Sequence, residues 1–299
     1  MSEVNKNDEM LISVLMSVYK ENVDYFERAL NSVLKQSHKS IQLILIVDDP
    51  ENEAVINYAQ NKAKEDCRLE IYINEKNMGL VKSLNKAFGL VKGNFVARMD
   101  ADDISEPTRF EKELEFLEEN ALDLVGCNYK LFSDNKAYGT TNLPVKDREI
   151  KNSLRRYQCI PHPSWLARRK VYEELKGYRD VSCCEDYDFL IRAANAGFKF
   201  GNIKEPLLNY RFNPQSISRT NETKQKLVAN FLKRNYDTGF EVDELYKYLE
   251  SDEYLKKFNS LNEWYGIKES FKLARQNKDI IGMMKYLARY AFNKHTYEN

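Results

Sequence analysis

The stretch VARMDADDISEP, residues 96–107, places three aspartates within four positions, directly after a run that predicts a β-strand. Asp100 and Asp102 are separated by one residue, so an extended backbone would point both carboxylates the same way. Two carboxylates held so close repel each other unless a cation or hydrogen-bond donors compensate. Aspartate is also a common turn and cap residue. The stretch therefore allows two interpretations, a structural turn or a site for a hard cation such as Mg²⁺, completed by substrate phosphates.

Working outward from this stretch, apolar runs alternate with helical patterns through the first half of the chain. The runs are LISVLMSV (11–18), IQLILIV (41–47), LEIYI (69–73) and NFVARM (94–99). Such runs predict a mainly parallel sheet covered by helices on both faces. Ligands of these sheets bind beyond the carboxyl ends of the strands. Three segments fall at such strand ends, Val18-Tyr19, Asp48-Asp49 and residues 100–103, and this recurrence predicts a shared pocket.

Composition narrows the class of protein. The 299 residues carry 46 lysines and arginines and 46 aspartates and glutamates, a balance that gives no support for a nucleic-acid partner or an acidic tail. Five cysteines without regular spacing indicate reduced thiols and give no zinc pattern. The polar start MSEVNKNDEM shows no secretory signal, and no apolar run is long enough to span a membrane. We therefore expect a cytoplasmic protein.

The second half predicts a change in organisation near residue 218. We expect a core domain over 1–218 and a helical C-terminal extension over 219–299, rich in lysine and tyrosine. Residues 279–295 have the pattern of a basic amphipathic helix. Such a helix either packs against its own domain, which we favour, or lies on a membrane surface.

Six segments together resemble the family 2 glycosyltransferases over about residues 11–215. They are ISVLMSVYKEN, LILIVDDPEN, NEKNMGLVKSLNKAF, VARMDADDISEPTRFEKEL, HPSWLARRKVYEELKGYRD and EDYDFLIRAANAG, in the family's order. Within the family, the chain is most similar to enzymes that build bacterial exopolysaccharide, capsule or O-antigen repeats. The resemblance implies the GT-A fold, a Rossmann-like, mainly parallel sheet flanked by helices.

The resemblance also implies a nucleotide-sugar site. Its residues would be Val18, Tyr19, Glu21, Asp48, Asp49, Asn77, Gly79, Lys82, Asp100, Ala101 and Asp102. Asp48 or Asp49 would accept a hydrogen bond from uracil, Asp102 would be the direct ligand of Mn²⁺ or Mg²⁺, and Asp100 would contact the metal or the ribose. The plainer alternatives are packing for Tyr19, an Asx turn for Asp48 and Asp49, turn geometry for Gly79 and a solvated charge for Lys82.

On the acceptor side, the resemblance implies Asp186 as general base, with Glu185 beside it and with His162 and Trp165 nearby. Asp186 stands where a helix begins, so an N-cap is its alternative role. His162 and Trp165 have structural alternatives in the core.

Two features depart from the family's pattern. Asn213 in NYRFNPQSIS stands where many relatives carry a histidine that completes the metal shell, and Cys183-Cys184 precede the expected base. The first leaves the strength of metal binding open, and the second has no explanation in the sequence.

The resemblance implies an inverting, metal-dependent transfer from a UDP-sugar to a saccharide acceptor linked to a polyprenyl diphosphate. The reaction would take place in the cytoplasm, at the inner face of the plasma membrane. A nucleotidyltransferase is an alternative, although such enzymes carry a glycine-rich phosphate loop where this chain has YKENVDY. A non-catalytic scaffold subunit that keeps the fold is another.

Overall fold

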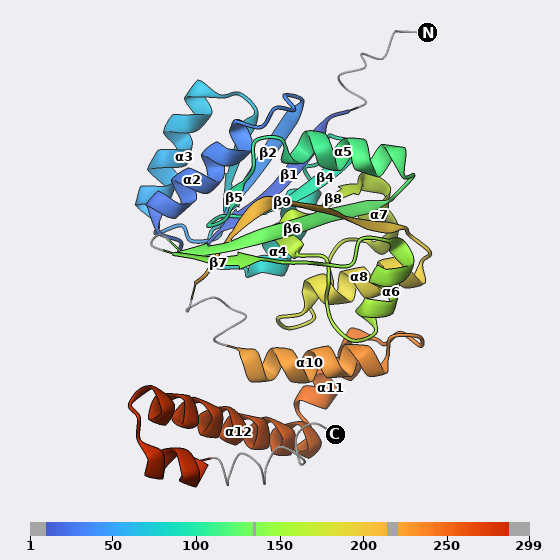
Figure 1. Ribbon diagram of the computed structural model, residues 1–299. Helices are drawn as coiled ribbons and strands as arrows, with labels where there is room; N and C mark the ends of the chain where they lie inside the picture. Colours follow the sequence, from blue (N-terminus) through green and yellow to red (C-terminus); the bar gives the residue numbers. More distant parts are fainter. Residues whose placement is uncertain (1–9, 134–135, 214–220, 287–299) are drawn as a thin grey trace, which may run out of the picture. The chain divides into compact units, whose positions relative to one another are not determined.

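The computed structural model describes residues 10–133, 136–213 and 221–286. The chain forms two compact units, one of residues 1–180 and 185–214 and the other of residues 181–184 and 215–299. The predicted boundary between residues 218 and 219 lies outside the described residues. Figure 1 gives the order of the elements along the chain.

A single sheet is the centre of the first unit. Its strands are β1 (Ile12–Val18), β2 (Ile41–Val47), β3 (Leu69–Ile73), β4 (Phe95–Asp100), β5 (Ile104–Ser105), β6 (Leu124–Ser133), β7 (Lys136–Thr140), β8 (Leu166–Arg168) and β9 (Phe200–Arg211). They lie in the order β3-β2-β1-β4-β8-β6-β9-β5, with β7 paired to β6. The strands β3, β2, β1 and β4 are all parallel, which confirms the prediction for this half, whereas β8 pairs antiparallel to β4 and to β6.

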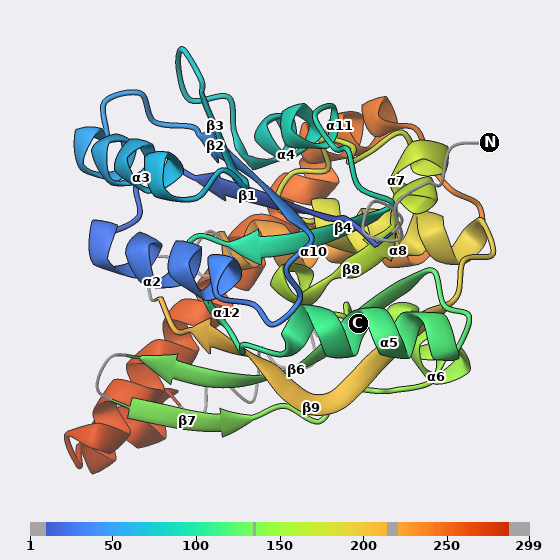
Figure 2. The ribbon, with the colours of Figure 1, turned by 90° about the horizontal axis from the view of Figure 1, so that it is seen from above.

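The parallel half forms because its strands are apolar on both faces. In β1 the side chains of Ile12, Val14 and Met16 join one core with α2 (Val23–Leu34) and α5 (Arg109–Glu119). The opposite face of β1 and β2 is covered by α4 (Leu80–Phe88). Seen from above, α4 and α5 lie on opposite sides of β1 and β4 (Figure 2). Burial on both faces is the usual state of parallel strands.

The remaining helices of this unit pack against the sheet or against one another. They are α3 (Glu53–Glu65), α6 (Asp147–Leu154), the short 3₁₀ helix η1 (His162–Ser164), α7 (Arg169–Leu175) and α8 (Glu185–Asn195). The parallel register brings Val18 beside Val47 and Ser17 beside Asp100. The carboxyl ends of β1, β2 and β4 therefore lie along one edge.

The second unit is helical, as predicted for the C-terminal part. It contains α10 (Glu222–Arg234), α11 (Val242–Leu249) and α12 (Asp252–Gln276), with Leu227, Tyr254 and Leu261 in a small core. Among the described residues, no helix is both long and apolar enough to span a membrane.

The paired cysteines belong to the second unit, in a turn with an unusual backbone. Ser182 and Cys183 have φ values of +21° and +68°. Gln225 of α10 donates from Nε2 to the carbonyl of Cys183 at 3.0 Å, and the buried Cys184 thiol donates to the carbonyl of Gln225 at 3.5 Å. This gives the cysteine pair a structural role, because a backbone in this region persists only when its surroundings hold it.

Candidate active site

The loop after β1 contributes an acidic side chain to the carboxyl edge of the sheet. Val18 is buried at the strand end, and Tyr19 is exposed. Glu21 accepts a hydrogen bond at Oε2 from the backbone N–H of Tyr19. Burial raises the pKa of Glu21, and the charge of Asp100 raises it further. Glu21 and Asp100 therefore face the same region.

Residues 100–106, called the acid loop below, carry the predicted cation-binding aspartates. Asp100 forms an ion pair with the fully buried Arg98. Burial, then the charges of Asp100 and Glu21, raise the pKa of Asp102 to about 7. Asp103 is also buried and accepts a hydrogen bond from the backbone N–H of Arg211 at 2.7 Å. The loop therefore holds the partly exposed carboxylate of Asp102 close to other negative charges.

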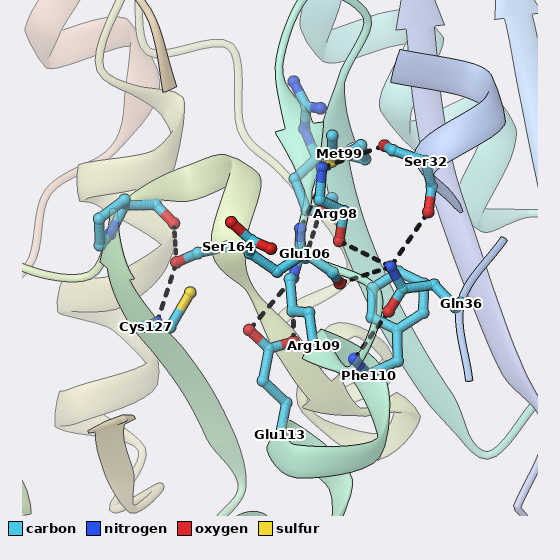
Figure 3. A network of polar contacts seen from close by, with 12 residues as sticks. Ser32, Gln36, Arg98, Met99, Glu106, Arg109, Phe110, Glu113, Cys127 and Ser164 are labelled. Atoms are coloured by element: carbon cyan, nitrogen blue, oxygen red, sulfur yellow. Dashed lines mark hydrogen bonds and ion pairs between the residues drawn. The ribbon is translucent and has the colours of Figure 1, made fainter. Parts of the chain in front are cut away.

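A buried polar network holds the acid loop from the core side (Figure 3). Arg109 of α5 donates from Nη2 to the carbonyl of Arg98 at 2.9 Å and forms a fully buried ion pair with Glu113. Gln36, which follows α2, donates from Nε2 to the carbonyl of Glu106 at 2.8 Å and to Ser105 Oγ at 3.1 Å. The network therefore holds the strand just before the loop and the last two residues of the loop before any ligand binds.

Asp48, at the end of β2, is a buried hydrogen-bonding centre. Its Oδ1 accepts from Asn74 Nδ2 at 2.7 Å and from the backbone N–H of Met78 at 2.8 Å. Its Oδ2 accepts from the backbone N–H of Gly79 at 2.9 Å. Lys86 of α4 in turn donates to Asn74 Oδ1 at 2.7 Å. Asp48 therefore shapes the turn that begins α4.

The other residues near Asp48 that are predicted to bind the nucleotide are more exposed than Asp48 itself. Asp49 is partly exposed and caps its own turn by accepting from the backbone N–H of Glu51. Asn77 is exposed, and its Oδ1 accepts from the N–H of Gly79. Gly79 has a φ of +85° and open space where a Cβ would lie, so its backbone conformation and not crowding requires glycine. Lys82 lies on the first turn of α4.

Asp186 and Glu185 open α8, next to the same group of charges. Asp186 accepts at Oδ1 from the N–H of Tyr187 at 2.7 Å and at Oδ2 from Gln158 Nε2 at 3.2 Å. Burial raises the pKa of Asp186 to about 6, with a further contribution from Asp100, while Arg98 lowers it. Burial and the neighbouring Asp186 raise the pKa of Glu185. The predicted base is therefore held in place and has a raised proton affinity.

The structure places His162 and Trp165 in the core. Trp165 has no exposed surface and donates from Nε1 to the carbonyl of Ile160 at 2.8 Å. The His162 ring packs edge-on against Trp165 with centroids 4.5 Å apart, and its Nε2 lies 2.8 Å from the hydroxyl of Tyr178. Burial lowers the pKa of His162 well below its usual value, so the ring is neutral. Trp165 therefore has the environment of its structural alternative, a core side chain, and its role on the acceptor side stays a prediction.

The acid loop offers some, but not all, of the oxygen ligands that a hard cation needs. Among the described residues, no group of three or more His, Cys, Asp or Glu side chains could hold a metal ion. Asp102 offers carboxylate oxygen, while one oxygen of Asp100 is engaged by Arg98. The residues therefore fit an ion whose coordination is completed by phosphate oxygens, a common arrangement for Mg²⁺.

Three contributors to this site escaped the sequence prediction. Arg98 supplies its internal positive charge, Gln158 holds Asp186 and Asn74 holds Asp48. Arg98 had a signal in the sequence, because residues 98 and 100 alternate onto the same side of a strand. Gln158 and Asn74 had none, since their partners lie 28 and 26 positions away.

Comparison with known proteins identifies the family of the chain. The chain belongs to glycosyl transferase family 2, whose model matches residues 13–176, more than half of its length. It is 31% identical over 231 residues to an uncharacterized glycosyltransferase of Methanocaldococcus jannaschii, covering 76% of this chain and 80% of the relative. It is 28% identical over 236 residues to the O-antigen biosynthesis glycosyltransferase WbnJ of Escherichia coli, covering 77% of this chain and 92% of the relative.

A solved structure supports the fold. The crystal structure of S. aureus TarS 1-349 in complex with UDP matches with a TM-score of 0.58 and 15% identity, covering 94% of this chain and 91% of that chain. The GT-A-type fold predicted from the sequence is thereby confirmed. Membership of the family makes the protein a glycosyltransferase, and it sets aside the nucleotidyltransferase and the non-catalytic scaffold.

Proposed function

We propose that this glycosyltransferase moves a sugar from a UDP-sugar to a lipid-linked saccharide during the synthesis of a bacterial surface polysaccharide. One observation carries the proposal. Glu21, Asp102 and Asp186 come from three separate segments, and each lies close enough to Asp100 for its charge to raise their pKa values. This acidic cluster supports a donor site beside a general base at one strand end. The UDP in the TarS crystal and the O-antigen role in the name of WbnJ favour this donor and this pathway.

Asp102, with the second oxygen of Asp100, would hold Mn²⁺ or Mg²⁺ together with the donor's diphosphate. A bound ion would neutralise the charge that develops on the leaving diphosphate. The protein contributes the acid loop. Contacts of Gln36 and Arg109 hold this loop, so Asp102 would keep its position during the reaction.

Asp186 would accept the proton of the acceptor hydroxyl as that oxygen attacks the anomeric carbon. Its raised pKa suits a general base, since proton affinity near the working pH favours transfer. Gln158 and the N–H of Tyr187 orient the carboxylate. Attack opposite the leaving diphosphate inverts the anomeric centre, without a covalent enzyme intermediate.

The test is UDP release from a panel of UDP-sugars with Mn²⁺ and a lipid-linked acceptor, comparing the wild type with Asp186→Asn. We expect the variant to lose about two to four orders of magnitude in kcat, the usual contribution of a general base, while its affinity for UDP stays unchanged. Asp243→Asn, on α11, is the control for the substitution itself. Full turnover by Asp186→Asn would remove Asp186 from the mechanism.

We also propose that the protein works in the cytoplasm, at the inner face of the plasma membrane, through the basic amphipathic segment 279–295. Ile280, Ile281 and Met284 are largely exposed, and Lys278 and Lys285 flank them. Residues 287–295 lie outside the described part. Ile280→Ser with Ile281→Ser should abolish flotation with anionic liposomes, and unchanged flotation would argue against this contact.

A further inference from the structure

Arg211, the last residue of β9, holds two consecutive residues of the acid loop. Its backbone N–H donates to Asp103 Oδ1 at 2.7 Å, and its side-chain Nε donates to the carbonyl of Asp102 at 2.8 Å. The residue is almost fully buried, with 4% of its surface exposed. The contact spans more than a hundred positions in the sequence, so it fixes the loop against a distant strand.

Two aromatic rings hold the guanidinium of Arg211. Its central carbon lies 3.8 Å from the ring centroid of Tyr25 in α2 and 4.6 Å from that of Phe132 in β6. Stacking of this kind is attractive and also restricts the plane of the group. One side chain therefore packs the start of α2, the ends of β6 and β9 and the acid loop together.

We propose that Arg211 is a positioning residue for Asp102. Its hydrogen bond to the Asp102 carbonyl holds the loop in the conformation that presents the Asp102 carboxylate to the donor. This inference rests on the proposed function for its consequence in donor binding, but its effect on the loop can be measured without any ligand.

Three substitutions separate the hydrogen bond from the charge. Arg211→Gln places an amide nitrogen where arginine has Nε, which keeps the donor and removes the charge. Arg211→Lys keeps the charge but has no N–H at that position, and Arg211→Met has neither. Lys204→Met, at an exposed position on the same strand, is the control.

The experiment measures amide hydrogen exchange over residues 100–106 without ligand, and UDP binding with Mn²⁺ by calorimetry. We expect faster exchange and about tenfold weaker UDP binding for Arg211→Lys and Arg211→Met, the usual scale for loss of a group that orients a ligand. Arg211→Gln and Lys204→Met should stay close to the wild type in both measurements. Thermal melts confirm that each variant is folded at the temperature used.

Two results would overturn the inference: wild-type loop exchange in Arg211→Lys and Arg211→Met, or a lysine variant that behaves as wild type while the glutamine variant does not. The latter would assign the effect to charge. If the wild type itself failed to bind UDP, the proposed donor would be wrong, and the exchange data would still decide the role of Arg211.

Discussion

Asp48 after β2 and Asp102 after β4 both belong to groups of aspartates at strand ends, but their environments are opposite. Asp48 accepts three hydrogen bonds from Asn74, Met78 and Gly79, so the protein itself satisfies it. Asp102 instead lies beside the charges of Asp100 and Glu21, and burial, followed by these charges, raises its pKa. A carboxylate satisfied by the protein stabilises the fold, whereas one crowded by like charges gains stability when a cation arrives. The two strand ends therefore have different roles.

Asp102→Asn should produce the largest effect on activity. Loss of the carboxylate removes the group proposed to face the ion, and we expect turnover to fall by about a hundredfold or more. The melting temperature should stay the same or rise, because the substitution relieves repulsion. Steady-state kinetics and calorimetric melts measure the two effects, and a clear fall in melting temperature would mean that Asp102 is structural.

Asp48→Asn should show the reverse pattern. The NH₂ group of asparagine would face one of the N–H groups that now donate to Asp48. A buried hydrogen bond would therefore be lost. We expect the free energy of unfolding to fall by about 1–3 kcal/mol, measured by urea denaturation. Unchanged stability would show that these three hydrogen bonds are not needed, and the contrast with Asp102 would disappear.

The pH dependence of stability sharpens the same comparison. A carboxyl group with a raised pKa in the folded protein binds a proton more readily there than in the unfolded chain. Protonation of Asp102 therefore stabilises the fold below about pH 7, and this contribution is lost as the pH rises through that value. From pH 8 to pH 5, the wild type should gain melting temperature relative to Asp102→Asn. Parallel profiles for the two proteins would contradict the raised pKa.

Asp49→Asn should have the smallest effect on stability. Its carboxylate caps only a local turn and remains partly exposed, so we expect a change within about 0.5 kcal/mol. A larger loss in urea denaturation would place Asp49 with Asp48 among the structural aspartates.

The sequence predicted most of the parallel half of the sheet, because continuous apolar runs such as IQLILIV allow few other arrangements. It could not separate Asp48 from Asp49, since the difference depends on backbone N–H groups of Met78 and Gly79, about thirty positions away. It also left two roles open for Trp165, whose burial depends on packing against His162 and Phe189. Local patterns reveal strand ends and acidic groups, but not which distant donors satisfy them.

Titration of UDP into the wild-type protein, with Mn²⁺ and then with EDTA, tests most directly whether the acid loop binds a cation and a diphosphate together. We predict that UDP binds at least about tenfold more tightly with Mn²⁺, as expected when an ion joins the phosphates to the protein. Equal affinity in EDTA would contradict this prediction.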